Sequence, residues 1–191
     1  YTGARLLKIF NNDNGVLVFD DKQINTIPIF PCIVKWIEMN NDGYLDLVAI
    51  GGDSTGGTSA RVYLNSPSYI LENSLGHYKG YLGVTAGAAN FGDFNNDGYS
   101  DLVISHPNAD TWTSSFDPNN SPIGTSNGQV DIYYGSQNGV PSIPNLTFYG
   151  EQDFQKIGQG LTVGDFNGDD FSDLVIGSPG FNQDDGKLDV Y

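Results

Sequence analysis

The chain has 191 residues, of which 38% are hydrophobic and 13% aromatic, so it can build a packed core and is not expected to be intrinsically disordered. Its 23 acidic and 8 basic residues give a net charge of −15, which excludes the basic surface that nucleic-acid binding requires. The single cysteine, Cys32, excludes an internal disulfide and a zinc site with paired thiolates. No apolar run approaches the roughly 18 residues of a membrane-spanning helix.

The chain begins with two short runs rich in Leu, Ile, Val and Phe, residues 4–10 and 15–21, which are joined by Asn14-Gly15. Asn-Gly between such runs is a strong signal for a β-hairpin. Because the chain starts at Tyr1 rather than at a methionine, we expect these strands to end a repeat unit of a longer protein.

Three copies of one pattern follow along the chain. They read EMNNDGYLDLVAI (38–50), DFNNDGYSDLVIS (93–105) and DFNGDDFSDLVIG (165–177). Each copy comes after a run of small or apolar residues and before a loop that leads to an alternating strand. The preceding runs are residues 32–37, 81–90 and 157–164, and the alternating strands are residues 60–65, 128–135 and 186–191. Repeats of this spacing are typical of propellers and solenoids.

The composition of these runs predicts an all-β fold. No segment has a helical period over 11 or more residues, and the runs are short, rich in Val, Ile, Tyr and Phe, and separated by Gly, Asn and Pro. Four strands per repeat, arranged radially, make a β-propeller, and we expect about three and a quarter blades of a larger ring of roughly seven. Residues 1–30 would end one blade, 31–80 and 81–156 would form two blades, and 157–191 a partial blade.

Each copy of the pattern also carries oxygen-bearing residues at the odd positions of a nine-residue loop. Odd positions in a tight loop can curl toward one centre and form a ring of hard oxygen donors. Ca²⁺ takes six to eight such oxygens in a flexible cage, whereas Mg²⁺ keeps more of its waters. The sequence therefore predicts three Ca²⁺ sites, with main-chain carbonyls at position 7. Their ligands are Glu38, Asn40, Asp42, Tyr44 and Asp46; Asp93, Asn95, Asp97, Tyr99 and Asp101; and Asp165, Asn167, Asp169, Phe171 and Asp173.

Two departures and two alternatives bear on this prediction. Glu38 is longer than the Asp at position 1 of the other loops, which predicts a looser site, and Asp170 replaces the Gly that permits the sharp turn at position 6. An EF-hand is excluded because position 12 is Ala49, Ile104 or Ile176 instead of Glu. The simpler alternative is that Asp-Asn-Gly clusters are only turns. Two observations favour metal binding over simple turns: the same donors occur in three copies, and the carboxylates of an empty loop would repel each other.

The sequence shows no catalytic constellation. His77 and His106 are isolated in predicted loops and are assigned to surface or packing roles, and no nucleophilic-serine or phosphate-loop motif is present. A long loop, residues 106–128, carries Trp112 and Phe116. These aromatic residues either contact a partner or fold back over the edge of the blade, since loops longer than about 12–15 residues are often functional.

One motif bears on the location of the protein. Asn145-Leu146-Thr147 is an acceptor for N-glycosylation. Together with calcium sites of modest affinity, which suit the millimolar calcium outside the cell, it predicts an extracellular, secreted or cell-surface protein.

The repeated pattern resembles the FG-GAP repeat family, whose blades carry a calcium loop between their first two strands and which includes the propeller of integrin α chains. DFNGDDFSDLVIGSPG followed by GKLDVY carries the resemblance, which covers about residues 30–191. The aromatic-Gly that opens the repeat is degraded to Tyr81-Leu82-Gly83 and Ile157-Gly158. Residues 132–179 are similar to the C-terminal propeller of the glycosylphosphatidylinositol-specific phospholipase D family, in which a catalytic metal-binding domain precedes the propeller.

The resemblance implies a calcium-binding, non-catalytic module that scaffolds a phospholipase D-like enzyme or binds its substrate or a partner. An integrin-like adhesion module that binds a protein is the alternative, and a carbohydrate-binding propeller is a weaker one. The implied partners are a protein, a glycolipid or a glycan, together with the rest of the propeller and a catalytic domain elsewhere in the protein.

Overall fold

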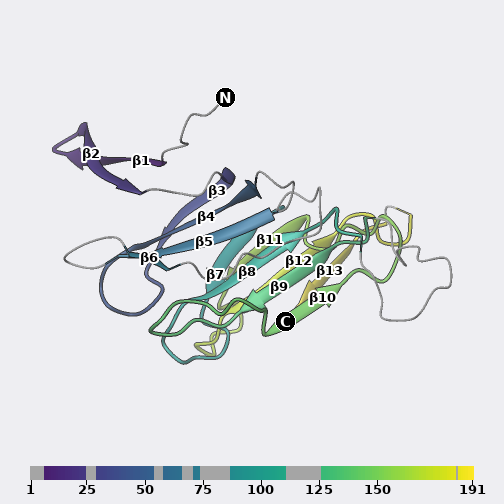
Figure 1. Ribbon diagram of the computed structural model, residues 1–191. Helices are drawn as coiled ribbons and strands as arrows, with labels where there is room; N and C mark the ends of the chain where they lie inside the picture. The colour runs from purple at the N-terminus through teal and green to yellow at the C-terminus, as the bar shows by residue number, and fades with distance from the viewer. Residues whose placement is uncertain are drawn as a thin grey trace.

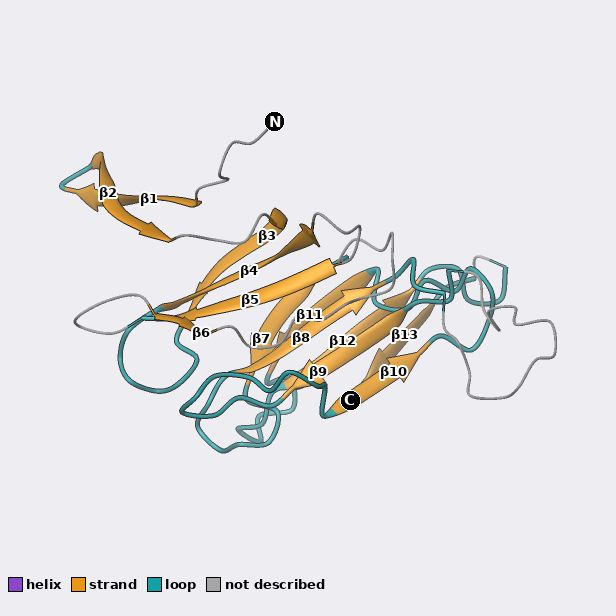
Figure 2. Cartoon of the chain, viewed as in Figure 1, coloured by secondary structure: helices purple, strands orange, loops and turns teal. Residues whose placement is uncertain are grey.

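The computed structural model describes residues 7–24, 29–53, 58–65, 71–73, 87–110, 126–183 and 185–191. This part of the chain contains thirteen β-strands and no helix (Figures 1 and 2), which confirms the all-β prediction. The strands are β1 Leu7–Asp13, β2 Val16–Ile24, β3 Ile29–Ile37, β4 Asp46–Asp53, β5 Thr58–Leu64, β6 Leu71–Asn73, β7 Ala89–Gly92, β8 Asp101–His106, β9 Gln129–Tyr133, β10 Leu146–Tyr149, β11 Gly160–Gly164, β12 Asp173–Ser178 and β13 Lys187–Val190. Within these residues no helix has the length and hydropathy that crossing a bilayer requires.

The strands form antiparallel sheets in which chain order is also spatial order. β1 pairs with β2, and the larger sheets are β3-β4-β5-β6, β7-β8-β9-β10 and β11-β12-β13. Figure 1 shows the larger sheets side by side, with their strands running in similar directions. Such meanders, repeated one after another, are the blades of a β-propeller. The described residues therefore form part of a β-propeller, as the sequence predicts.

Hydrophobic clusters fill the space between successive sheets. Alternate residues of β8 face opposite sides, so that Leu102 and Ile104 pack toward β3–β6 while Val103 packs toward β11–β13. The first cluster contains Met39, Val48, Ile50, Val62, Ala89, Leu102, Ile104, Tyr133 and Val140. The second contains Val103, Val130, Ile132, Ile157, Leu174 and Ile176. Because strand β8 is covered on both faces, the Leu-Val-Ile run that follows the acidic loop is buried throughout.

The apolar residue at position 2 of each acidic loop belongs to these interfaces. Met39 is fully buried against the second sheet, and Phe94 packs against the cluster shared with the third sheet. Phe166, at the same position of the third loop, is 80% exposed. Leu188 and Val190 of β13 are also exposed. The position-2 side chain is therefore covered only where another sheet packs against its own.

Polar side chains on the first strands of two of the sheets, β3 and β7, reach across the same interfaces. Lys35 Nζ donates to the carbonyl of Ala89 and to Oδ1 of Asn90, both at 2.9 Å. Asn90 Nδ2 in turn donates to the carbonyl of Leu161 at 3.0 Å. Lys35 and Asn90 occupy equivalent places, since each pairs with the valine two residues after the position-9 aspartate. These bonds fix the register of neighbouring blades along their first strands.

Candidate metal centres

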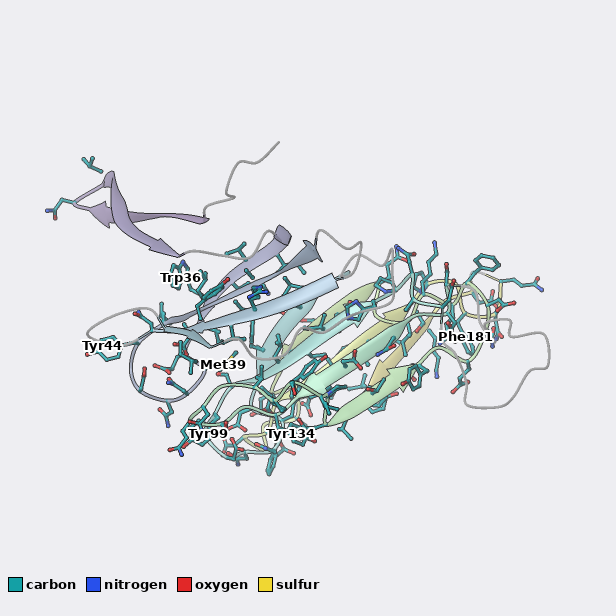
Figure 3. The ribbon with its side chains drawn as sticks, viewed as in Figure 1. Trp36, Met39, Tyr44, Tyr99, Tyr134 and Phe181 are labelled. Atoms are coloured by element: carbon teal, nitrogen blue, oxygen red, sulfur yellow. The ribbon has the colours of Figure 1, made fainter. Side chains whose placement is uncertain are left out.

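The three acidic loops occupy the same place in successive sheets, because each connects the first strand of its sheet to the second. Residues 38–45 join β3 to β4, residues 93–100 join β7 to β8, and residues 165–172 join β11 to β12. In Figure 3 the loop residues Tyr44 and Tyr99 lie at the lower left of the molecule. The repeated topology places all three predicted sites at the same end of their sheets.

One hydrogen-bond pattern organises all three loops. In the middle loop Asp97 N donates to Asp93 Oδ1 at 3.1 Å, Asn95 Nδ2 donates to Asp97 Oδ2 at 2.9 Å, and Tyr99 N donates to Asp97 Oδ1 at 3.0 Å. The same three bonds recur at Glu38, Asn40, Asp42 and Tyr44, and at Asp165, Asn167, Asp169 and Phe171. The structure thus brings positions 1, 3 and 5 together in each loop.

Two backbone reversals in each loop produce this convergence. Position 4 is Asn41, Asn96 or Gly168, with φ of 57°, 54° and 78°. Position 6 is Gly43, Gly98 or Asp170, with φ of 85°, 85° and 69°. Asp170 therefore adopts the left-handed conformation that the two glycines adopt, although a side chain disfavours it.

Substituting Asp170 with Gly is expected to raise the free energy of unfolding by about 1 kcal/mol, since glycine enters the left-handed region without steric conflict. The backbone N–H of residue 170 can still donate to Asp165 Oδ2, so the loop keeps that bond. Urea denaturation in calcium-free buffer measures the change. The reverse substitution Gly98→Asp should destabilise the chain, and a loss of stability in Asp170→Gly would mean that the Asp170 side chain holds the loop together.

The aspartate at position 9 has a role that the sequence did not reveal. Asp101 is fully buried, and its carboxylate accepts hydrogen bonds from Phe94 N at 2.8 Å and from Gly135 N at 2.7 Å. It therefore ties the start of the loop to the segment after the third strand of the same sheet. Asp46 makes the equivalent bonds with Met39 N and Asn65 N. The partly buried Asp173 accepts from Phe166 N and Asn167 N.

Burial raises the pKa of Asp46 and of Asp101, because a carboxylate loses hydration in the interior. The two backbone N–H donors oppose this rise, and the carboxylates at positions 1 and 5 add to it. Among the described residues, no cationic side chain contributes to either shift. A cation held by such a loop would supply positive charge and favour the ionised form.

An unsatisfied amide oxygen in the first loop indicates that these residues fit a metal ion. Asn40 Oδ1 is buried and has no hydrogen-bond partner among the described residues, while the Nδ2 of the same side chain is bonded to Asp42. A buried acceptor without a donor is unfavourable unless a cation or water meets it. No three His, Cys, Asp or Glu side chains of the described residues form a metal cluster on their own. The cage would therefore depend on amide and main-chain oxygens as well, which is the mixed donor set that Ca²⁺ accepts.

Of the histidines and the long-loop aromatic residues singled out from the sequence, the structure describes only His106. The prediction that His106 lies in a loop is wrong, because strand β8 extends to His106 and its side chain is only 2% exposed. Of the surface and packing roles predicted for it, this burial agrees with packing. His77, Trp112 and Phe116 lie outside the described residues.

The buried His106 predicts a loss of stability in acid. Desolvation lowers the pKa of His106, with the nearby Asp131 opposing the shift, so the unfolded chain takes up the proton first as the pH falls. The free energy of unfolding should therefore decrease as the pH falls below the ordinary histidine value of 6.5. Urea denaturation at pH 7.5 and 5.5 measures this, and His106→Gln should flatten the dependence. An equally steep dependence in that variant would contradict the assignment.

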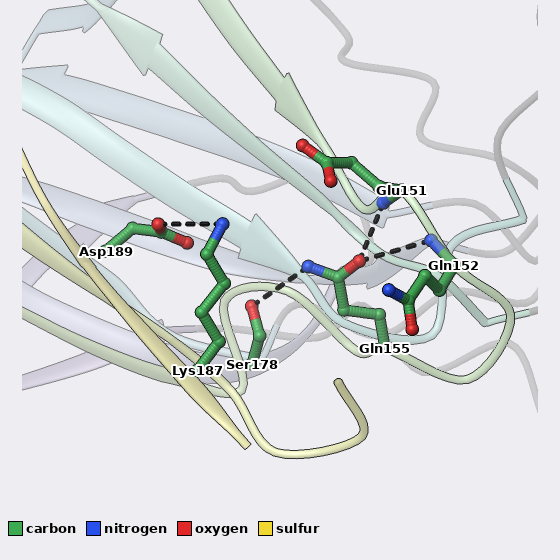
Figure 4. Close-up of polar contacts among 6 residues, drawn as sticks. All are labelled: Glu151, Gln152, Gln155, Ser178, Lys187 and Asp189. Atoms are coloured by element: carbon green, nitrogen blue, oxygen red, sulfur yellow. Dashed lines mark hydrogen bonds and ion pairs between the residues drawn. The ribbon is translucent and has the colours of Figure 1, made fainter. Parts of the chain in front are cut away.

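A second polar cluster lies in the connection between the second and third sheets (Figure 4). The buried Gln155 accepts hydrogen bonds from Glu151 N at 2.7 Å and Gln152 N at 3.2 Å, and its Nε2 donates to Ser178 Oγ at 3.4 Å. A Cβ atom at Gly180 would collide with the main chain of Phe154. These contacts attach the segment between β10 and β11 to the end of β12, so we assign the cluster a structural role.

Comparison with known proteins identifies the repeat. Residues 86–133 and 157–191 match the FG-GAP repeat, and residues 39–104 match the FG-GAP-like repeat. Phosphatidylinositol-glycan-specific phospholipase D of Bos taurus is 31% identical over 159 residues, which cover 74% of this chain and 18% of that protein. Integrin alpha-PS5 of Drosophila melanogaster is 30% identical over 160 residues, covering 75% of this chain and 14% of that protein. Integrin alpha-V of Gallus gallus is 36% identical over 110 residues, covering 56% of this chain and 9% of that protein.

The chain therefore spans less than a fifth of these relatives. The residues that match these two repeats overlap the three acidic loops and include the strands that follow them. They agree with the resemblance that the sequence pattern indicated. The chain belongs to the FG-GAP repeat family.

Proposed function

We propose that this chain is a calcium-binding, non-catalytic propeller module in which each of the three acidic loops holds one Ca²⁺. The observation that carries the proposal is the shared loop geometry, which gathers oxygens from positions 1, 3 and 5 in the same way three times. The unpartnered Oδ1 of Asn40 and the buried Asp46 and Asp101 support it, because each is better satisfied by a cation.

The charge of the chain favours the same conclusion. Two carboxylates about 4 Å apart repel each other by roughly 1 kcal/mol in water and by nearer 4 kcal/mol at an effective dielectric constant of 20. Three divalent cations would offset six of the fifteen net negative charges. Calcium fits better than magnesium, because the donors are numerous and the loops are exposed and built from turns, whereas Mg²⁺ demands a rigid octahedron.

The ligand assignment is tested by Asp97→Asn, which removes the central charge of one loop. Calorimetric titration should show one of three calcium sites lost or strongly weakened, with the other two still titrating. Asp185→Asn makes the same change of charge at an exposed residue outside the loops and should leave all the sites unchanged. Equal calcium binding by Asp97→Asn and Asp185→Asn would exclude the middle loop as a site.

We further propose that the module is extracellular and acts by scaffolding or partner binding. Its relatives carry the names of a phospholipase D and of integrin α chains, at 31% and 30% identity. In the first context the module would hold a catalytic domain or present its glycolipid substrate, and in the second it would bind a protein. Asn145, the predicted glycosylation site, is exposed and so is accessible to a glycan.

The two kinds of relative are equally similar to this chain, at 31% and 30% identity, and therefore support both contexts. An experiment on the protein in its full length separates them. Release of a glycosylphosphatidylinositol-anchored reporter from membranes would support the phospholipase context. Calcium-dependent binding to a protein ligand without release would support the adhesion context. Binding only to an immobilised glycan array would favour the carbohydrate-binding alternative instead.

A further inference from the structure

Successive acidic loops are hydrogen-bonded to each other. Ser172, at position 8 of the third loop, donates its main-chain N–H to the carbonyl of Asp93 at 2.9 Å, and its Oγ accepts from Asp93 N at 3.0 Å. Asp93 is the position-1 ligand of the second loop. The serine therefore bonds both the main-chain N–H and the carbonyl of Asp93, a proposed calcium ligand that lies 79 residues away in sequence.

The second loop contacts the first in a related way. Ser100, also at position 8, donates its Oγ to the carbonyl of Glu38 at 2.7 Å and its N–H to the carbonyl of Met39 at 3.2 Å. Glu38 is the position-1 ligand of the first loop. Position 8 of the first loop is Leu45, which carries no hydroxyl and is 55% exposed. The serine contacts thus run from the third loop to the second and from the second to the first.

The residue before Asp93 is adapted to this contact. A Cβ atom at Gly92 would come within 2.7 Å of both Cβ and Oγ of Ser172 and within 2.6 Å of Val163 Cγ1. Such distances are below van der Waals contact, so only glycine allows Ser172 to approach. The corresponding residue before the first loop is Ile37. There the N–H of Ser100 bonds one residue further along, to the carbonyl of Met39, while its Oγ bonds to Glu38.

We infer that the serine at position 8 is a positioning residue for the metal loop of the preceding sheet, so that the three calcium sites are coupled in series. The inference rests on the proposed calcium function. Ser172 directly precedes Asp173, a ligand of the third loop, so an ion in that loop fixes the serine. A fixed Ser172 holds Asp93 in place and reduces the ordering that the second loop undergoes on binding its own ion.

Calcium-dependent hydrogen exchange of the intact chain tests this, because peptides from each loop report the calcium midpoint of that loop separately. Ser172→Ala removes one hydrogen bond and should raise the midpoint of the second loop about three- to tenfold, as expected for about 1 kcal/mol. Ser100→Ala should raise the midpoint of the first loop and leave the third unchanged. Each variant is the matched control of the other.

The coupling itself is measured by disabling the third loop with Asp169→Asn. This variant should raise the calcium midpoint of the second loop. In the Ser172→Ala background, which keeps only the main-chain bond to Asp93, the further rise should be smaller. If calcium protects none of the loops, the proposed calcium function fails. If all three loops respond but Ser172→Ala leaves the second loop unchanged, or shifts all three midpoints equally, the series coupling is overturned while the calcium function stands.

Discussion

Removing calcium with EDTA is expected to lower the free energy of unfolding by about 8 kcal/mol, which is the largest effect predicted for this chain. A ligand that binds only the folded state stabilises it by about 2.7 kcal/mol when its concentration is 100 times its dissociation constant. The contributions of three independent sites add, which gives about 8 kcal/mol. For a chain of this size, each kcal/mol shifts the melting temperature by roughly 2–4 °C, so the fall should be about 15–30 °C. Circular dichroism melts with calcium and with EDTA measure it.

The triple variant Asp42→Asn, Asp97→Asn, Asp169→Asn is the control for this experiment. It should melt at the same temperature in calcium and in EDTA, because each loop has lost its central carboxylate. It should also be more stable than the calcium-free parent, since three repelling charges are gone. If EDTA leaves the melting temperature of the parent chain unchanged, the loops are turns that need no metal.

The second large effect is predicted for Asp101→Ala, which should lower the free energy of unfolding by about 3–5 kcal/mol even without calcium. The substitution leaves the N–H groups of the partly buried Phe94 and the buried Gly135 without their acceptor. Hydrogen bonds to a charged group contribute about 1.5–3 kcal/mol each. Urea denaturation in EDTA measures this loss separately from the loss of a metal ligand.

Asp173→Ala is the matched control in the third loop. Asp173 is only partly buried, and its bonds are confined to the N–H groups of Phe166 and Asn167 in its own loop. Water can replace it there, so this variant should be destabilised by less than half as much. Equal losses in the two variants would mean that the bond from Gly135 to Asp101 contributes nothing.

The fold and the inner geometry of the loops could be predicted because both depend on local sequence. Three copies of one pattern define the repeat, and the period-2 alternation of each run defines the strand faces that pack between sheets. Spacing alone places positions 1, 3 and 5 together. The left-handed φ of Asp170 was also foreseeable, since its two counterparts are glycines.

The contacts that hold each loop in the molecule could not be predicted, because they depend on how the sheets are placed. Asp101 meets Gly135 across 34 residues, and Ser172 meets Asp93 across 79. Neither serine stands out in the sequence. His106 was misplaced because the Leu-Val-Ile strand extends two polar residues further than hydrophobicity indicates.

We propose that the three acidic loops of this FG-GAP chain are calcium sites. Calorimetric titration of the metal-free chain tests it most directly, because it counts the ions as well as detecting them. We expect three Ca²⁺ per chain, with Mg²⁺ at the same concentration failing to displace them. A chain that binds no calcium, while folded and free of competing metal, would contradict it.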